Sequence, residues 1–440
     1  MKSARQAAFE ILIKMHRDSA YSNLAIDSKL NECKMNSKDK ALVTAIVYGV
    51  LERKITLDYV ISLHLKQSIN KLKPEVLVIL RMGAYQILFM DKIPVSAAIN
   101  ESVNLSKKNK CVFASGLINA VLRNISRYEI EFPDYKKDKN FYYSIKYSCP
   151  ADIVGLWIDS YGEDTAVKIM ESSLETAPTV VRVNTLKTTT NELVNIFSEQ
   201  GISASICKEI ENAIVLEKAG SIENIKAYKD GLFHIQDTAS QLCCKALNAK
   251  GDDVVFDLCA APGGKSFTIC EYMKNDGFVY SFDLYKERVK LIEDGAKRLG
   301  VTNLNAKTLD ASVFDDSIGF ADKVLCDVPC SGLGIIRRKP EIKYKRLEDI
   351  DNLPNIQYDI LQTASKYVKK GGRLLYSTCS LNLAENDEVC DRFLEENKQF
   401  SVVKSLENVN TFNNNSNYLT LMPHINNSDG FFIATFVRTE

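Results

Sequence analysis

Two cysteines stand out because each directly follows a short apolar run of the strand-forming type. Cys330 lies in the sequence DVPCSG (residues 327–332), and Cys379 lies in STCS (residues 377–380). A free cysteine is most often a small buried apolar side chain. Beyond the end of a strand in a parallel sheet, however, side chains line the edge where ligands bind, and a thiolate there can act as a covalent nucleophile. This placement favours Cys330 and Cys379 as reactive thiols.

Four acidic side chains each end a predicted strand, namely Asp257, Asp283, Asp310 and Asp327. A single acid at a strand end is more often a helix cap or a solvated side chain. Asp283 follows the loop after the first strand by roughly 20 residues, where doubly wound folds place an acid that holds ribose hydroxyls. Four acids on successive strands favour an adenosine-type cofactor laid across the edge of the sheet.

The loop after the first of these strands begins at Cys259 and is rich in glycine. The adjacent residues Gly263 and Gly264 let the backbone approach a ligand closely and begin the next helix. The sequence GKS at 264–266 also matches the end of a phosphate-binding P-loop. That motif needs glycine at position 259, so a nucleoside triphosphate site is the weaker alternative.

These residues require a scaffold that brings strand ends together. From about residue 236 the chain alternates strand and helix patterns, which is typical of a parallel, doubly wound, Rossmann-like α/β sheet. The predicted strands are the apolar runs 254–258, 278–283, 304–310, 323–327 and 373–377. We therefore expect an α/β catalytic domain over residues 236–440.

Two different regions precede this domain. Apolar residues at helical spacing predict an all-α bundle over residues 1–135. The charged, proline-containing segment 131–141 is typical of a linker. The β-rich pieces 179–183 and 213–216 flank a helical stretch, and they predict a small α/β domain over residues 142–235.

The formal net charge of zero hides an asymmetry along the chain. Residues 1–140 carry 23 basic and 14 acidic side chains, whereas the remaining 300 residues carry 33 basic and 42 acidic ones. Such an asymmetry indicates a polyanion-binding part joined to a different module, although solvated helical faces also vary in charge.

A second basic region follows the Cys330 motif. The sequence RRKPEIKYKR, residues 337–346, contains six basic residues and one acidic residue. We favour the interpretation that this segment contacts a phosphate backbone, and the alternative is a solvated surface loop. The side chains expected to contact the polyanion are Arg337, Arg338, Lys339 and Lys343.

The composition excludes several classes of protein. With 45% apolar and 25% charged residues, the 440-residue chain is globular, of two or three domains, rather than disordered or fibrous. The most apolar stretch, 76–90, contains Arg81 and is too short to span a bilayer, and the first residues lack the core of a secretory signal. Twelve cysteines without CxxC pairs argue against a zinc site and a disulfide framework. We expect a cytoplasmic protein with no metal and no membrane association.

The motifs resemble those of the RNA cytosine-5 methyltransferases that use S-adenosylmethionine. The resemblance rests on DVPCSG (327–332), STCS (377–380) and CAAPGGK (259–265), and the helical N-terminus is similar to the NusB-type RNA-binding domain of antitermination factors. Together these features resemble the Sun/Fmu family over essentially the whole chain. The resemblance implies a NusB-like helical domain, a small α/β (RRM-like) linker domain and a Rossmann-like methyltransferase domain.

The resemblance also implies roles for individual residues. The thiolate of Cys379 would add to carbon 6 of cytosine, Cys330 would assist release of the methylated product, and Asp327 would hold the N3 and N4 edge of the base. S-adenosylmethionine would contact Cys259, Ala260, Ala261, Pro262, Gly263, Gly264, Lys265, Asp283, Asp310 and Asp327.

The substrate that the resemblance implies is a specific cytosine of 16S ribosomal RNA, free or partly assembled. We expect a monomer, because nothing in the chain demands a partner subunit. A DNA cytosine-5 methyltransferase shares the Pro-Cys motif but uses that cysteine as its nucleophile and lacks the second one. The presence of both Cys330 and Cys379 therefore favours RNA. A transfer RNA or 23S ribosomal RNA target is one alternative, and a non-catalytic RNA-binding factor is another.

Overall fold

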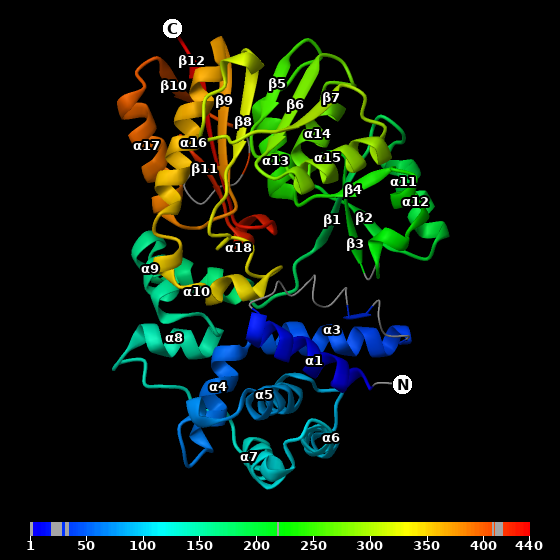
Figure 1. The fold of residues 1–440 in the computed structure, drawn as a ribbon, viewed down its shortest axis with the longest axis vertical. Helices are drawn as coiled ribbons and strands as arrows, with labels where there is room; N and C mark the ends of the chain where they lie inside the picture. Colours follow the sequence, from blue (N-terminus) through cyan, green and yellow to red (C-terminus); the bar gives the residue numbers. More distant parts are fainter. Residues whose placement is uncertain (1–2, 19–28, 31–34, 218–219, 407–408, 410–416) are drawn as a thin grey trace. The chain divides into compact units, whose positions relative to one another are not determined.

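The computed structural model describes residues 3–18, 29–30, 35–217, 220–406, 409 and 417–440, and the chain packs as two compact units (Figure 1). The N-terminal unit comprises Met1–Glu175 and Ile336–Leu347, and the C-terminal unit comprises Thr176–Ile335 and Glu348–Glu440. Both candidate cysteines therefore lie in the C-terminal unit, whereas the basic segment after Cys330 belongs to the N-terminal unit.

The first part of the N-terminal unit is a bundle of helices, as the spacing of its apolar residues predicts. Its helices are α1 (Ala4–Asp18), α3 (Ser37–Glu52), α4 (Lys54–Leu63), α5 (Pro74–Phe89), α6 (Val95–Lys108) and α7 (Ser115–Ile125). Pro74 is the first residue of α5 and Pro94 caps α6, positions at which the missing N–H costs no helical hydrogen bond. Alanine, valine, leucine and isoleucine side chains from these helices share one buried core.

Helices continue beyond the predicted linker. Three of them, α8 (Lys139–Tyr147), α9 (Ala151–Tyr161) and α10 (Glu163–Ser172), belong to the N-terminal unit. The Asp138 side chain caps α8 by accepting a hydrogen bond from the N–H of Phe141. The Thr56 hydroxyl of α4 donates to the carbonyl of Ile145 at 2.5 Å, which ties α8 to the bundle.

The C-terminal unit begins with a four-stranded antiparallel sheet in the order β2-β3-β1-β4. Its elements are β1 (Thr179–Val183), α11 (Thr190–Glu199), β2 (Ser203–Ile206), β3 (Ala213–Glu217), α12 (Lys226–Lys229) and β4 (Phe233–Ile235). The expected strands at 179–183 and 213–216 are confirmed. Strand β2 was not predicted because its sequence, SASI, is only four residues long and contains a single strongly apolar residue.

An eight-stranded sheet carries the candidate site. Its strands follow the order β10-β12-β9-β8-β5-β6-β7, with β11 paired to β12 (Figure 1). The parallel strands are β5 (Val254–Asp257), β6 (Phe278–Asp283), β7 (Leu304–Thr308), β8 (Ala321–Asp327) and β9 (Val368–Thr378). The antiparallel strands are β10 (Phe400–Val403), β11 (Leu419–Leu421) and β12 (Phe431–Arg438). The sheet is therefore mixed, whereas the sequence predicts a parallel one.

Helices cover both faces of this sheet because alternate side chains of each strand point to opposite faces. Phe256, Val324 and Leu374 pack in one core with α16 (Leu353–Tyr367) and α17 (Asp387–Glu396). Val255 and Leu325 pack in the other core with α13 (Thr238–Leu247) and α14 (Gly264–Tyr272). Helix α15 (Lys286–Leu299) follows β6, and the short helix α18 (Pro423–Asn426) precedes β12.

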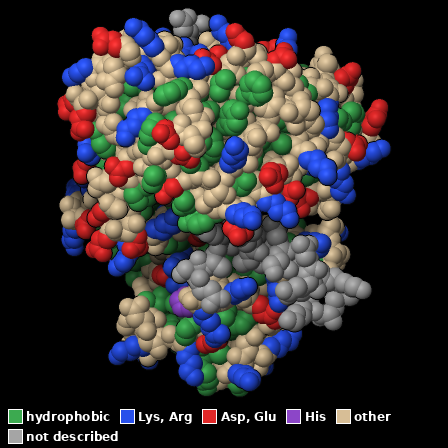
Figure 2. Space-filling view, turned by 45° about the horizontal axis from the view of Figure 1, so that its top comes forward, with side chains coloured by type: hydrophobic (Ala, Val, Ile, Leu, Met, Phe, Trp, Pro, Cys, Tyr) green, Lys and Arg blue, Asp and Glu red, His purple; other side chains and the backbone are tan. Residues whose placement is uncertain are grey.

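The surface of the described residues has a mixed charge. Figure 2 shows acidic and basic side chains interspersed over the visible face rather than separated into regions of one sign. Among the described residues, no helix combines the length and the apolar character needed to cross a membrane.

Candidate active site

The glycine-rich loop joins the end of β5 to the start of α14. Gly263 has a φ of +106°, a left-handed conformation that L side chains rarely adopt. A Cβ atom there would lie 2.4 Å from the ring of Phe267, so glycine is required both by conformation and by space. The loop N–H of Ala260 donates to the carbonyl of Phe282, which anchors the loop beside the end of β6.

Asp283 lies at the end of β6 and is buried against this loop. Its carboxylate accepts hydrogen bonds from the N–H of Ala261 at 3.3 Å and of Tyr285 at 3.2 Å. The guanidinium of Arg288 pairs with it at 3.0 Å and also donates to the carbonyl of Ala261. These bonds hold Asp283 at a fixed place beside the loop.

Asp310 has different surroundings. It is exposed beyond the end of β7, and its carboxylate accepts hydrogen bonds from the N–H and hydroxyl of Ser312 at 3.0 and 2.7 Å. These hydrogen bonds lower the pKa of Asp310. The structure thus places Asp310 at the same edge of the sheet but in a solvated turn.

Asp327, at the end of β8, forms an ion pair with Lys265 of the glycine-rich loop. Asp327 Oδ2 is 2.6 Å from Lys265 Nζ, and Asp327 Oδ1 accepts a hydrogen bond from the Ser377 hydroxyl at 2.9 Å. Burial of Lys265 opposes its charge, but the neighbouring carboxylate of Asp327, together with Cys243 and Cys244, raises the pKa of Lys265. Lys265 Nζ also lies 5.1 Å from the centre of the Phe431 ring. An ion pair therefore joins the glycine-rich loop to the end of β8.

Asp257, at the end of β5, is a buried acid. Burial raises its pKa to about 7, although the Ser266 hydroxyl donates to Asp257 Oδ2 at 2.6 Å. Its other carboxylate oxygen has no hydrogen-bond partner among the described residues. Burial, followed by the negative charges of Asp257, Asp327 and Asp283, raises the pKa of Cys259. Asp257, Asp283 and Asp327 thus all lie near Cys259 in the glycine-rich loop.

The two candidate cysteines meet at the same edge. Cys330 Sγ and Cys379 Sγ are 3.1 Å apart, and both side chains are half-buried free thiols. The hydrogen bond with Cys379, together with burial, raises the pKa of Cys330 well above its usual value. Either sulfur can be the donor in this contact, so the two thiols share one proton position between them.

A close approach between backbones holds the Cys379 loop. The N–H of Gly334 donates to the carbonyl of Cys379 at 2.9 Å, and the N–H of Gly430 donates to the carbonyl of Gly334 at 2.9 Å. A Cβ atom on Gly334 would lie 2.0 Å from the carbonyl oxygen of Gly430. Only glycine at position 334 allows this contact.

The residues at this edge fit a ligand with a positive charge and hydroxyl groups. The buried, partly unpaired carboxylate of Asp257 lies among other acids, an arrangement that a cationic group would stabilise. Asp283 supplies a carboxylate fixed beside the loop, which suits hydroxyl donors. Cys259, Ala260, Ala261, Pro262, Gly263 and Gly264 form the loop between these acids.

The basic segment differs from its expected role at one residue. Lys343 is buried in the short helix η5 (Pro340–Tyr344), and its ammonium group donates to the carbonyl of Glu52 at 2.7 Å. Burial lowers the pKa of Lys343 to about 8. In this structure the charge of Lys343 is enclosed by the helical bundle, so its expected contact with a phosphate stays a prediction that requires this segment to open. Arg337, Arg338 and Lys339 are half-buried.

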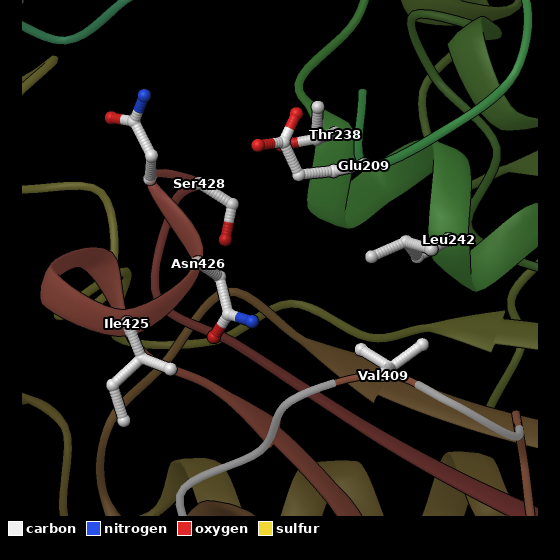
Figure 3. Close-up of a pocket in the computed structure, with 8 residues that line it drawn as sticks. Glu209, Thr238, Leu242, Val409, Ile425, Asn426 and Ser428 are labelled. Carbon is white, nitrogen blue, oxygen red and sulfur yellow. The ribbon is translucent and has the colours of Figure 1, made fainter. Parts of the chain in front are cut away.

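A cavity of about 260 Å³ lies elsewhere in the C-terminal unit (Figure 3). Leu242 and Val409 give it apolar walls, and the polar side chains in the close-up include Glu209, Thr238 and Asn426. None of the described residues that line it is a predicted site residue. The sequence does not predict this cavity, because its lining comes from segments far apart in the chain.

Two further site residues were missed by sequence reasoning. Arg288 neutralises Asp283, and Ser377 holds one oxygen of Asp327. Arg288 lies in the first turns of the helix after the acid, and Ser377 is the first residue of the STCS motif. Their positions were visible in the sequence, but their partners were not.

Three family models match successive parts of the chain. The NusB family model matches residues 2–127, a ferredoxin-like domain of RsmF/B-like methyltransferases matches 149–223, and the 16S rRNA methyltransferase RsmB/F model matches 244–437. The resemblance to a NusB-like domain joined to a methyltransferase is thus confirmed.

Two relatives and one solved structure cover large parts of the chain. A probable ribosomal RNA small subunit methyltransferase B of Bacillus subtilis is 39% identical, covering 98% of each chain. One from Synechocystis is 31% identical over 100% of each chain. A methyltransferase homologue from Pyrococcus horikoshii is 27% identical with a TM-score of 0.61, covering 68% of this chain and 99% of its own. The chain therefore belongs to the ribosomal RNA small subunit methyltransferase B family.

Proposed function

We propose that this ribosomal RNA methyltransferase transfers a methyl group from S-adenosylmethionine to carbon 5 of a specific cytosine in 16S ribosomal RNA. The observation that carries the proposal is the pair of thiols, Cys330 and Cys379, which lie 3.1 Å apart at the edge where the strand-end acids gather. The small-subunit substrate is supported by the names of the relatives.

The chemistry of cytosine explains the need for a thiol. Carbon 5 is a poor nucleophile, and addition of a thiolate to carbon 6 gives carbon 5 carbanion character. The bound S-adenosylmethionine supplies the methyl group that carbon 5 then takes. Loss of the proton on carbon 5 and cleavage of the carbon–sulfur bond restore the aromatic ring and the thiolate.

The two cysteines are assigned different roles by their motifs. Cys379, in the STCS motif, is the candidate for the thiolate that attacks carbon 6, and Cys330, in the DVPCSG motif, assists release of the methylated product. The distance of 3.1 Å between the two sulfurs supports this assignment because both thiols can reach the same base.

Asp327 suits the task of holding the base. Each of its oxygens has one partner, Lys265 or Ser377, and a carboxylate oxygen can accept a second hydrogen bond. Its side chain is 28% exposed, so a base can reach it. Asp327 would accept a hydrogen bond from the N4 amino group, and a proton shared between its carboxyl group and N3 would offset the negative charge that builds on the ring.

The remaining acids suit the methyl donor. S-adenosylmethionine carries a sulfonium and an ammonium group, which complement the carboxylates around Cys259. Asp283 would bind the ribose hydroxyls, Asp310 the adenine edge, and Lys265 together with the loop from Cys259 to Gly264 would enclose the ligand.

The RNA must present an accessible base. A target cytosine has to leave its stack to reach Cys379, which costs least in a looped or weakly paired segment. The NusB-like domain, with its excess of basic residues, would hold RNA around the target.

The test uses the full chain with radiolabelled S-adenosylmethionine and unmodified small-subunit RNA. We expect label on carbon 5 of one cytosine with the wild type, none with Cys379→Ala, and a covalent protein–RNA adduct that accumulates with Cys330→Ala. Cys390→Ala, which removes a buried thiol of α17, is the matched control and should retain labelling.

The outcomes separate the alternatives. Absence of label in any cytosine would indicate a non-catalytic RNA-binding factor, and label in transfer RNA or 23S RNA instead would reassign the substrate. An adduct that accumulates with Cys379→Ala would reverse the roles of the two cysteines.

A further inference from the structure

One buried carboxylate outside the mechanism contacts both loops that carry the cysteines. Glu385 ends the short helix η7 (Leu383–Glu385) and is fully buried. Asn382 caps this helix by accepting a hydrogen bond from the N–H of Ala384, and this fixes the turn that delivers Glu385 to the site.

On one side, Glu385 holds the loop of Cys330. Its Oε2 accepts a hydrogen bond from the N–H of Ser331 at 2.8 Å, and its Oε1 accepts from the Ser331 hydroxyl at 2.5 Å. Gln357 donates to Glu385 Oε2 at 2.9 Å and to the carbonyl of Pro329 at 3.0 Å. Ser331, after Cys330, is therefore bound directly to this carboxylate, and Pro329, before Cys330, is connected to it through Gln357.

On the other side, Glu385 holds the loop of Cys379. The Ser380 hydroxyl donates to Glu385 Oε1 at 2.7 Å and lies 2.8 Å from the Ser331 hydroxyl. The Tyr376 hydroxyl donates to the backbone carbonyl of Glu385 at 2.6 Å. The adjacent Asn386 donates to the carbonyl of Ser380 at 3.0 Å. Ser331 and Ser380, which follow the two cysteines, thus both donate to the carboxylate of Glu385.

We propose that Glu385 is a positioning residue that sets the distance between the thiols of Cys330 and Cys379. A carboxylate accepts at both oxygens, so it can receive N–H and hydroxyl donors from two loops at once. A buried acceptor with this many donors is costly to remove, because the donors lose their partners. The proposal rests on the proposed function only for its consequence in catalysis, not for the distance between the thiols.

The consequence for the reaction follows from the roles of the two cysteines. Cys379 must reach carbon 6 while Cys330 remains beside the same base for product release. A small displacement of a reacting group costs a large factor in rate. Glu385→Ala should therefore lower kcat at least tenfold and leave KM for RNA within threefold.

Glu385→Gln is the conservative variant. The side of Oε2 faces N–H donors, which need an oxygen, whereas Oε1 faces the hydroxyls of Ser331 and Ser380, which can accept as well as donate. A glutamine with its amide oxygen at Oε2 and its amide nitrogen at Oε1 keeps all of these contacts and loses only the hydrogen bond of 3.3 Å that Asn382 donates to Oε1. Glu385→Gln should therefore restore most of the kcat that Glu385→Ala loses.

The deciding measurement reports on the thiols without any methylation. Phenylarsine oxide condenses with two neighbouring thiols to form two arsenic–sulfur bonds, and its oxygen leaves as water. Native mass spectrometry under competition from a monothiol measures how tightly the arsenical is held. The full chain should retain it, and Cys330→Ala should lose it because only one thiol remains at the site.

We expect Glu385→Ala to hold the arsenical at least tenfold more weakly than the wild type. Glu271→Gln is the matched control, since Glu271 is a buried carboxylate of the same unit whose hydrogen bonds go to Arg182. It should hold the arsenical as the wild type does. Wild-type affinity in a folded Glu385→Ala, or no difference between the wild type and Cys330→Ala, would overturn the proposal.

Gln357→Ala decides the matter if Glu385→Ala does not fold. It removes the donor shared by Glu385 and Pro329 and should weaken retention of the arsenical, whereas Glu385→Gln, which keeps the oxygen at Oε2, should retain the arsenical nearly as the wild type does. Wild-type arsenical affinity in a folded Gln357→Ala overturns the proposal. Failure of the wild type to methylate cytosine would contradict the proposed function, but the arsenical result would still decide the role of Glu385.

Discussion

Lys265 and Lys343 are both lysines removed from solvent, yet their surroundings give them opposite electrostatic properties. Lys265, in the C-terminal unit, lies 2.6 Å from the carboxylate of Asp327, and its pKa is raised although burial opposes the charge. Lys343, in the N-terminal unit, donates to the backbone carbonyl of Glu52, and burial lowers its pKa to about 8.

The difference shows what a buried ammonium group needs. A full negative charge compensates the loss of hydration, whereas a carbonyl dipole does so only in part. Lys265 is thus a charged member of the site. Lys343 is a packing residue of the N-terminal unit, although in the sequence it belongs to a run of basic residues.

The largest effect that tests this comparison is on methyl transfer. Lys265→Met leaves the carboxylate of Asp327 without its counter-ion, so kcat should fall by about 10²–10³-fold, as for loss of one charge-stabilising group in an active site. Lys343→Met should change kcat by less than about threefold, because an apolar chain of similar length replaces a buried amine. Single-turnover methylation at saturating RNA measures both, and equal losses would contradict the comparison.

The next largest expected effect is on the pH dependence of stability, through the buried carboxyl group of Asp257. Burial raises the pKa of Asp257 to about 7, so between the pKa of the unfolded acid and pH 7 the folded state binds more protons than the unfolded state. Stability therefore falls as pH rises through this window. Relative to Asp257→Asn, the wild type should lose roughly 4 kcal/mol of the free energy of unfolding, at about 1.4 kcal/mol per pKa unit.

Urea unfolding of both proteins at pH 4 to 8 measures this loss. Asp310→Asn is the control, because hydrogen bonds from Ser312 lower the pKa of this exposed acid and its linkage has the opposite sign. A constant difference between wild type and Asp257→Asn across the range would show that Asp257 is not the titrating group.

Lys343 should give a pH dependence of the opposite sign. Between its folded pKa of about 8 and the higher pKa of an unfolded lysine, the unfolded state binds more protons, so stability rises with pH. Relative to Lys343→Met, the wild type should gain roughly 3 kcal/mol of the free energy of unfolding by the upper end of this window. Urea midpoints at pH 7 to 10 measure the gain, and parallel curves for the two proteins would contradict it.

The smallest effect separates Lys343 from its neighbours in RNA binding. If Lys339 contacts a phosphate, Lys339→Ala should reduce the slope of log affinity against log salt by about 0.7–0.9. Lys343→Met should leave the slope unchanged, because its ammonium group is enclosed. Fluorescence anisotropy with a 16S RNA fragment over a salt series measures both slopes, and a loss of slope in Lys343→Met would mean that this segment opens on binding.

Much of the fold and the outline of the site could be predicted because the relevant signals are local. The apolar runs before Asp257, Asp283 and Asp327 are strands, and both cysteines follow strands at one edge of the sheet. The short strand β4 (Phe233–Ile235) was not predicted, because three residues carry too little periodicity. The burial of Lys343 could not be predicted either, since its partner Glu52 lies 291 residues away in the chain.

By itself the sequence determined which groups are available for chemistry and which edge of the sheet they occupy. Strand periodicity and turn residues act over a few positions, so they can be read without the fold. Only the tertiary structure decided that Asp327 pairs with Lys265, that the two thiols meet, and that Glu385 lies between their loops. Charge and burial depend on neighbours that are distant in the chain, and packing alone brings those neighbours together.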